Sequence, residues 1–93
     1  MMRSAANLIK IAEAEVGYME KASNSNLDNK TANSGPNNYT KYGRDLYYAG
    51  YYNNATTNGR PWCNSFVDWC FYELCGRNKA LAEAMLYQTG VNT

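Results

Sequence analysis

The stretch "GRPWCNSFVDWCFYELCG", residues 59–76, carries the clearest structural pattern in this chain of 93 residues. From Cys63 onward, apolar residues recur at offsets of 3, 4, 7, 8 and 11, which is the spacing of one continuous face of an α-helix. Pro61 just before this run and Gly76 just after it are typical of a helix start and a helix end. The pattern predicts a helix over 63–75 whose apolar stripe consists of Cys63, Phe66, Val67, Cys70, Phe71 and Leu74.

Three cysteines lie on this predicted helix, and their spacing limits what they can do. Cys63 and Cys70 would lie about 10.5 Å apart along the helix axis, whereas a disulfide allows at most about 7 Å between Cα atoms. Cys70 and Cys75 would be about 7.5 Å apart and would point in different directions. Spacings of seven and five residues, in a chain without histidine, do not match a structural zinc site. We therefore expect no disulfide within the helix, no metal and no cofactor.

Cys63 differs from the other two cysteines because it opens the predicted helix. The free N–H groups and the positive dipole end there stabilise a thiolate, and they can hold the oxyanion that forms when a thiolate attacks an amide. Cys70 and Cys75 fit the alternative role of small buried apolar residues. Position alone leaves both roles open for Cys63. A catalytic cysteine normally gives its proton to a histidine, and this chain has none.

The remaining sequence predicts more helices and a long polar loop. A helix is expected over 4–16, with Ser4 as its N-cap and Gly17 at its end, and another over 78–88 with Asn78 as its cap. Residues 38–48 have weaker helical character, residues 22–38 predict a loop, and no run of strands is visible. The expected apolar faces are Ala5, Leu8, Ile9, Ala12 and Val16 in the first helix, Tyr39, Tyr42 and Leu46 in the second, and Leu81, Ala84 and Met85 in the last.

Composition and charge exclude several classes of partner. The formal net charge is +1, which argues against a nucleic-acid partner, because such proteins normally present a basic face. No stretch approaches the roughly 20 apolar residues that span a bilayer, so no membrane partner is expected. The apolar run near the start is interrupted by Lys10 and ends at Glu13 and Glu15, so we expect no signal peptide.

Three segments together resemble the amino-terminal half of CHAP domains, the cysteine- and histidine-dependent amidases and peptidases of bacterial and phage cell-wall hydrolases. They are "GYMEK" at 17–21, "NYTKYG" at 38–43 and the stretch at 59–76, so the resemblance runs from about Glu13 to Gly76. It implies a papain-like α+β fold in which Cys63 is the nucleophile. It also implies that the sheet and the catalytic histidine lie beyond Thr93, so that residues 1–93 form a partial, mainly α-helical CHAP-like domain.

The resemblance implies a function as well as a fold. The chain would be a fragment of a peptidoglycan amidase or endopeptidase, inactive alone, acting outside the cell or at the cell wall, where a phage can deliver it. Trp62, Asn64 and Tyr42 are the candidate substrate-binding residues, although a small apolar residue is usual where Asn64 stands. Each has an alternative role: Trp62 as a core aromatic, Asn64 as a neutral residue and Tyr42 as a structural residue. The alternative is a non-catalytic helical binding or interaction module. In either case, the helix 63–75 stripe lacks the sheet that would cover it. It must then be covered by the helices expected over 4–16 and 78–88, or by another chain through self-association.

Two further functions are weighed and set aside. Glu20 would be the acid of a glycosidase, but no second carboxylate is suitably placed, which favours a structural role. The residues after Asp28 do not follow the calcium-loop pattern, so calcium is not favoured. The amphipathic rings of Tyr47, Tyr48, Tyr51 and Tyr52 suit stacking on glycan rings, although packing is the commoner role of such residues.

Overall fold

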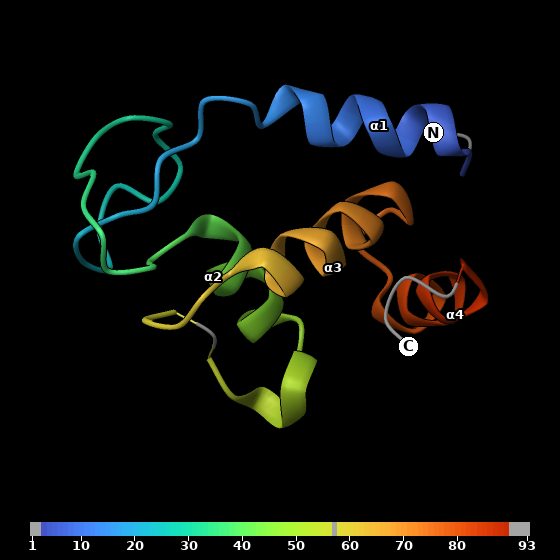
Figure 1. Cartoon of the computed structure of the whole chain (residues 1–93). Coiled ribbons are helices and arrows are strands. Elements are labelled where there is room, and N and C mark those ends of the chain that lie inside the picture. Colours follow the sequence, from blue (N-terminus) through green and yellow to red (C-terminus); the bar gives the residue numbers. More distant parts are fainter. Residues whose placement is uncertain (1–2, 57, 90–93) are drawn as a thin grey trace.

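The computed structural model describes residues 3–56 and 58–89 and shows a small, mainly helical globule (Figure 1). Its elements are α1 (Ala5–Ala14), α2 (Lys41–Tyr48), the short 3-10 turn η1 (Tyr51–Asn54), α3 (Cys63–Leu74) and α4 (Lys79–Thr89). Within the described ranges there is no extended strand, and the β-type pairing consists of isolated bridges from Lys21 to Ser34 and to Tyr39. The prediction of a mainly helical chain is confirmed.

Helix α3 is the central element, because α1, α2 and α4 all pack against it (Figure 1). Leu46 of α2 is fully buried, and the ring of Tyr42, 1% exposed, lies within 5 Å of the rings of both Phe66 and Trp69. Buried apolar area is the main favourable term in folding, so this cluster holds the helices together. Its buried members are Tyr18, Tyr42, Leu46, Tyr51, Trp69, Cys70, Phe71, Tyr72, Cys75, Ala82 and Leu86.

The predicted apolar stripe of α3 is only part of what this helix buries. Cys70, Phe71 and Leu74 are buried as expected, and Phe66 and Val67 are partly buried. The opposite side of α3 is covered as well, since Ser65, Asp68, Trp69 and Tyr72 are also buried. Apart from Cys63, which is exposed, the stripe is therefore buried or partly buried within the chain itself. Self-association through this face stays a prediction, and the burial does not favour it.

Helix α1 begins as predicted but turns a different face to the core. The Ser4 side chain accepts a hydrogen bond from the Asn7 N–H at 3.2 Å, and Gly17 has a left-handed φ of 91° just beyond the helix. Leu8 and Ala12 pack on the core as expected, together with Ile11, which was not predicted. Ala5, Ile9 and Val16 are exposed, so the predicted apolar face is wrong at these three residues. The reason is that a stripe through Leu8, Ile11 and Ala12 also has helical spacing.

The other two helices each require one correction. Tyr42 and Leu46 are buried in α2 as expected, but Tyr39 precedes the helix, which starts after the N-cap Thr40. Asn78 caps α4 by accepting from the Leu81 N–H at 3.1 Å. Ala84 is exposed, whereas Ala82 and Leu86 are buried and Leu81 and Met85 pack on the core, so the predicted position of Ala84 is wrong.

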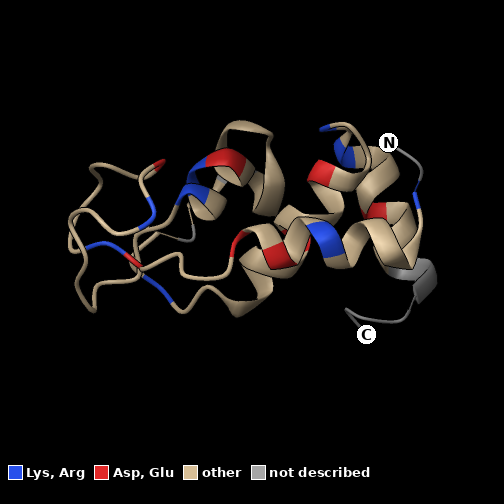
Figure 2. Ribbon diagram, turned by 90° about the horizontal axis from the view of Figure 1, so that it is seen from above, with Lys and Arg blue, Asp and Glu red and all other residues tan. Residues whose placement is uncertain are grey.

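The polar segment between α1 and α2 is ordered by hydrogen bonds rather than by apolar packing, and it lies at the end of the molecule away from α4 (Figures 1 and 2). The Tyr18 hydroxyl donates to the Leu27 carbonyl at 2.6 Å and accepts from the Lys41 N–H at 2.9 Å. Lys21 is fully buried, and its ammonium lies 4.9 Å from the centre of the Tyr18 ring. Burial lowers the pKa of Lys21. The expected loop is confirmed, with a fixed conformation.

Charges of both signs are interspersed along the molecule (Figure 2). Arg44 and Asp28 are joined by two hydrogen bonds of 2.9 and 2.7 Å, which tie α2 to the polar segment. In the part of the chain that is described, no helix has the length and apolar character needed to cross a membrane.

Candidate functional site

Cys63 is the first residue of α3, and its side chain is exposed. The preceding residue, Trp62, has φ −116° and ψ 14° and makes no side-chain hydrogen bond that would cap the helix. The Phe66 N–H is the first to bond a carbonyl of this segment, that of Trp62, at 2.9 Å. The N–H groups of Cys63 and Asn64 therefore lie at the open end of the helix, where backbone donors have no carbonyl of the same helix to bond.

This open start is unusual within the molecule. Ser4, Thr40 and Asn78 each accept a backbone N–H at the start of α1, α2 and α4, at 3.2, 3.1 and 3.1 Å respectively. Such caps stabilise a helix by about 1 kcal/mol each, so their use is expected. Helix α3 has an aromatic residue in the cap position instead. The uncapped helix is the one that carries the exposed cysteine.

Trp62 forms the wall of two adjoining grooves beside the start of α3. Its ring stacks on that of Tyr42, with 5.6 Å between the ring centres and 28° between the planes. One groove, of about 430 Å³, runs between Trp62 and the segments 18–20 and 34–36. The other, of about 280 Å³, is mainly apolar and is lined by Ala12, Glu15, Val16, Tyr18, Tyr42, Trp62 and Phe66. Trp62 thus lines both grooves, whereas Cys63 is not among the lining residues of either.

The other two predicted substrate-binding residues have different surroundings. Asn64 is exposed in the first turn of α3, next to Cys63. Tyr42 lines the apolar groove but is 1% exposed, and its hydroxyl donates to the Glu15 carboxylate at 3.0 Å. Burial, together with the negative charge of Glu15, raises the pKa of Tyr42. Tyr42 therefore stabilises the position of Trp62 by ring stacking, and little of its own surface can touch a ligand.

Cys70 and Cys75 are free and buried, in agreement with the prediction that they are apolar core residues. Burial, with the negative charges of Glu15 and Glu73 adding to it, raises the pKa of Cys70 to about 12. Burial also raises the pKa of Cys75, whose thiol lies 3.8 Å from the Met85 sulfur. Neither thiol has the exposed, thiolate-stabilising surroundings that a nucleophile needs.

The residues weighed for glycosidase or calcium chemistry have structural partners. One carboxylate oxygen of Glu20 accepts from the Asn38 N–H at 2.7 Å, which fixes the end of the polar loop. Asp28 is paired with Arg44, and the positive charge and hydrogen bonds of Arg44 hold the pKa of this carboxyl below its usual range. Among the described residues, no group of three or more His, Cys, Asp or Glu side chains could hold a metal ion.

A second polar arrangement escaped the sequence analysis. Asp68, on α3, is 7% exposed, and its carboxylate accepts a hydrogen bond from the hydroxyl of Tyr52 in η1. Tyr52 and Asn53 both have positive φ, at 56° and 57°, which is uncommon for residues with a side chain. The only available sequence signal was an acidic residue inside an apolar helix pattern.

Comparison with protein-family models, with curated proteins and with solved structures finds no match for this chain.

Proposed function

We propose that the chain is the cysteine-bearing half of a papain-like α+β domain of the CHAP type, and that Cys63 is the nucleophile of a peptidoglycan amidase or endopeptidase. The observation that carries this proposal is the start of α3, where an exposed thiol adjoins backbone N–H groups without a side-chain cap. A capping side chain would occupy the donors that an oxyanion needs, so leaving them open suits acyl transfer.

The chemistry follows from these groups. A base takes the proton of the Cys63 thiol, and the thiolate attacks the carbonyl carbon of a peptidoglycan amide. The N–H groups of Cys63 and Asn64 stabilise the oxyanion, the C–N bond breaks, and the amine leaves with the proton that the base returns. Water then attacks the thioester, which releases a carboxylate and restores the thiol. The net reaction is the hydrolysis of one amide bond.

The base must come from outside this chain, because the chain contains no histidine. In the proposed complete domain, a histidine on the sheet supplies it. We accordingly expect residues 1–93 to be inactive alone. The two grooves that meet at Trp62 offer an extended peptide an apolar wall, and the proposed place of action is the cell wall or the extracellular space, including delivery by a phage.

Chemical rescue tests this proposal without the missing half. The chain is incubated with purified peptidoglycan, with and without imidazole as a substitute for the histidine side chain, and the release of new amino groups is measured. Mass spectrometry follows acyl adducts on each cysteine in parallel. We expect amine release only when imidazole is present, together with an acyl adduct confined to Cys63.

Two variants provide the matched controls. Cys63→Ala should abolish both amine release and the adduct, while Cys75→Ala, which changes a buried cysteine at the other end of α3, should leave them in place. Amine release that persists in Cys63→Ala contradicts a nucleophilic role for this residue. An adduct on all three cysteines indicates a general thiol reagent rather than a site.

A non-catalytic interaction module is the second candidate, and one observation favours it. Ile9 and Val16, on and just after α1, are exposed by 55% and 75%, and Met19 is exposed close by. Exposed apolar side chains that gather on one element often mark an interaction surface. Under this function, the rescue experiment yields no product, and replacing Val16 with Ser weakens association with a partner.

A further inference from the structure

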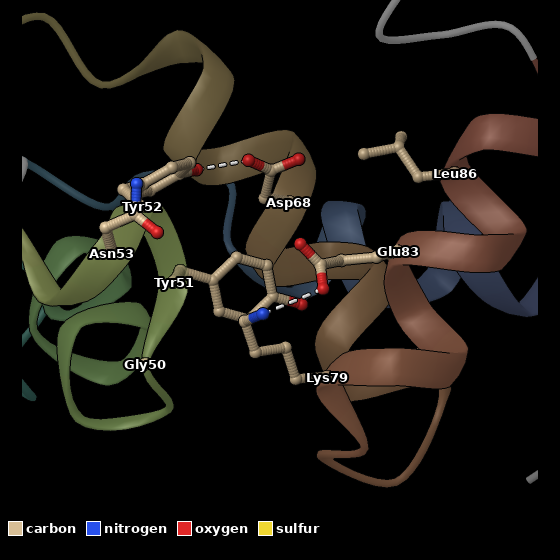
Figure 3. Close-up of a pocket in the computed structure, with 8 residues that line it drawn as sticks. All are labelled: Gly50, Tyr51, Tyr52, Asn53, Asp68, Lys79, Glu83 and Leu86. Atoms are coloured by element: carbon tan, nitrogen blue, oxygen red, sulfur yellow. Dashed lines mark hydrogen bonds and ion pairs between the residues drawn. The ribbon is translucent and has the colours of Figure 1, made fainter.

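A cavity of about 390 Å³ lies between η1, the middle of α3 and α4 (Figure 3). Its size falls at the lower end of the range for small-molecule sites, about 300–1,000 Å³. The wall combines polar groups from three separate elements: Tyr51, Tyr52 and Asn53 from η1, Asp68 from α3, and Lys79 and Glu83 from α4. None of these residues takes part in the function proposed above.

Asp68 is the unusual member of this wall, because it is buried without a positive partner. The half-buried carboxylates of Glu15, Asp45 and Glu73 each form an ion pair with Lys or Arg. Asp68 is more than nine-tenths buried but forms no ion pair with any described residue, and only its Oδ2 atom accepts a hydrogen bond, from Tyr52. Burying an unpaired charge is costly, so such a group needs an explanation.

The one cation in the wall is already committed elsewhere. The Lys79 ammonium lies 2.8 Å from a carboxylate oxygen of Glu83 and 5.3 Å from the centre of the Tyr51 ring. The cavity therefore holds two carboxylates and one ammonium. Figure 3 shows the Asp68 carboxylate with Tyr52 on one side and Glu83 and Leu86 on the other. A single positive charge placed beside Asp68 would neutralise the site.

We propose that this cavity binds a primary alkylammonium group, with the ammonium on Asp68 and Glu83 and the alkyl stem against Leu86 and the tyrosine rings. The Oδ2 atom of Asp68 already accepts a hydrogen bond from Tyr52, and Oδ1 is the oxygen without a described partner, which suits one compact charged donor better than the two parallel donors of a guanidinium. An ammonium presents a compact charge with three donors, which suits acceptors on separate elements. Burial of Asp68 and the nearby charge of Glu83 raise the pKa of its carboxyl, which a bound cation would reverse.

This inference is independent of the proposed function, and binding measured by NMR tests it directly. The probe is n-butylammonium, and its neutral counterpart is 1-butanol. We expect saturable changes in the amide signals of residues 50–53 and 83–86 with the amine and none with the alcohol. The amide of Nα-acetyl-lysine serves as a second probe. If it binds at least as tightly, the ligand is a peptide bearing a primary amine, and if only butylammonium binds, it is a small free amine.

Three variants decide which residues carry the binding. Asp68→Asn keeps the shape and the acceptor for Tyr52 but removes the charge, and should weaken binding of butylammonium about tenfold or more. Glu83→Gln should weaken the binding of butylammonium several-fold. Its side chain is half-exposed, so the substitution should not prevent folding. Glu13→Gln removes an exposed acid on α1 and should change nothing. Equal binding of butanol, unchanged affinity in both site variants, absence of a saturable shift, or calcium binding in place of the amine each overturns the proposal.

Discussion

Cys63 and Cys70 lie seven residues apart on α3, at the start and in the middle of the helix, and these two regions differ in exposure, capping and packing. Around Cys63 the helix is exposed, has no side-chain cap, and is bordered by grooves at Trp62. Around Cys70 the helix is enclosed by α1, α2 and α4, and the thiol is 4% exposed. The comparison teaches that a helix can be anchored by its middle and far end while its first turn is left available for chemistry.

The contacts of the buried part of α3 fix the position of its exposed first residues. Trp69 donates from its indole N–H to the Asp45 carboxylate at 3.0 Å, and the Asp45 carboxylate also receives Arg44 and Arg77. These contacts fix the rotation of α3 about its axis. A site on a rigid element is held more exactly than a site on a loop. The direction in which Cys63 projects is therefore set by residues well away from it.

The largest expected difference between the start and the middle of α3 is in the reactivity of the thiols of Cys63 and Cys70. Iodoacetamide at neutral pH should modify Cys63 at least about a hundred-fold faster than Cys70, because Cys63 is exposed whereas the pKa of the Cys70 thiol is raised to about 12, which leaves almost none of it as the reactive thiolate. Burial slows Cys70 further. Mass spectrometry of peptides from a time course measures both rates in one sample. Similar rates for the two cysteines would mean that α3 opens readily, and would contradict the difference in exposure between Cys63 and Cys70.

The next largest difference is in stability. Leu74→Ala, at a position 2% exposed, should lower the free energy of unfolding by about 2–5 kcal/mol, since it removes buried methyl groups and leaves a cavity. Asn64→Ala, at an exposed position of the first turn, should stay within about 0.5 kcal/mol. Urea unfolding of both variants measures the two effects. A large loss in Asn64→Ala would show that the first turn contributes to the stability of the fold and is not merely available.

Local signals in the sequence predict most of the helical structure. The stripe in residues 63–75, the cap residues Ser4 and Asn78, and Gly76, whose φ is 65°, all act within one or two helix turns. Such effects depend only on near neighbours, so they can be read without the fold. The exposed position of Cys63 and the burial of Cys70 follow from the same pattern, since one begins the helix and the other lies in its middle.

The remaining features depend on residues that are distant in sequence. The prediction of the face that α1 buries was wrong at Ile9 and Val16. Two stripes with helical spacing share Leu8 and Ala12, and only the packing against α3 determines which of them is buried. The burial of Lys21 arises from backbone pairing with Tyr39, in which the Lys21 N–H donates to the Tyr39 carbonyl at 2.8 Å. Nothing in the composition of a polar loop announces such a contact.

The cavity at Asp68 is the clearest example of a feature without a local signal. Tyr52 and Glu83 lie 16 and 15 positions away from Asp68 in the chain, on different elements, and meet it only through the packing of η1 and α4 on α3. A polar residue in a helical stripe can be placed on a face from its sequence position. Whether it finds a positive partner there depends on the tertiary structure.

The smallest expected effect tests whether the buried carboxyl of Asp68, in the middle of α3, lowers the stability of the fold. Burial raises the pKa of the Asp68 carboxyl above its ordinary value of 3.8, so the folded state holds the proton more tightly than the unfolded state does. Stability is therefore greatest below the ordinary pKa and falls as pH rises through the raised pKa of the folded state. Tyr51 and Tyr52 of η1 and Lys79 and Glu83 of α4 are the ionisable groups that line the cavity with Asp68.

Asp68→Asn should remove this fall. Thermal unfolding at pH 4 and pH 7 should show that the variant gains Tm relative to the natural chain as the pH rises, by on the order of a few degrees, whereas the two proteins should be nearly equal at the lower pH. Glu13→Gln, which removes the same charge from an exposed position on α1, controls for net charge. A Tm difference that is the same at both pH values would mean that Asp68 is not buried at a cost, and a buried acid that costs nothing needs no ligand to explain it.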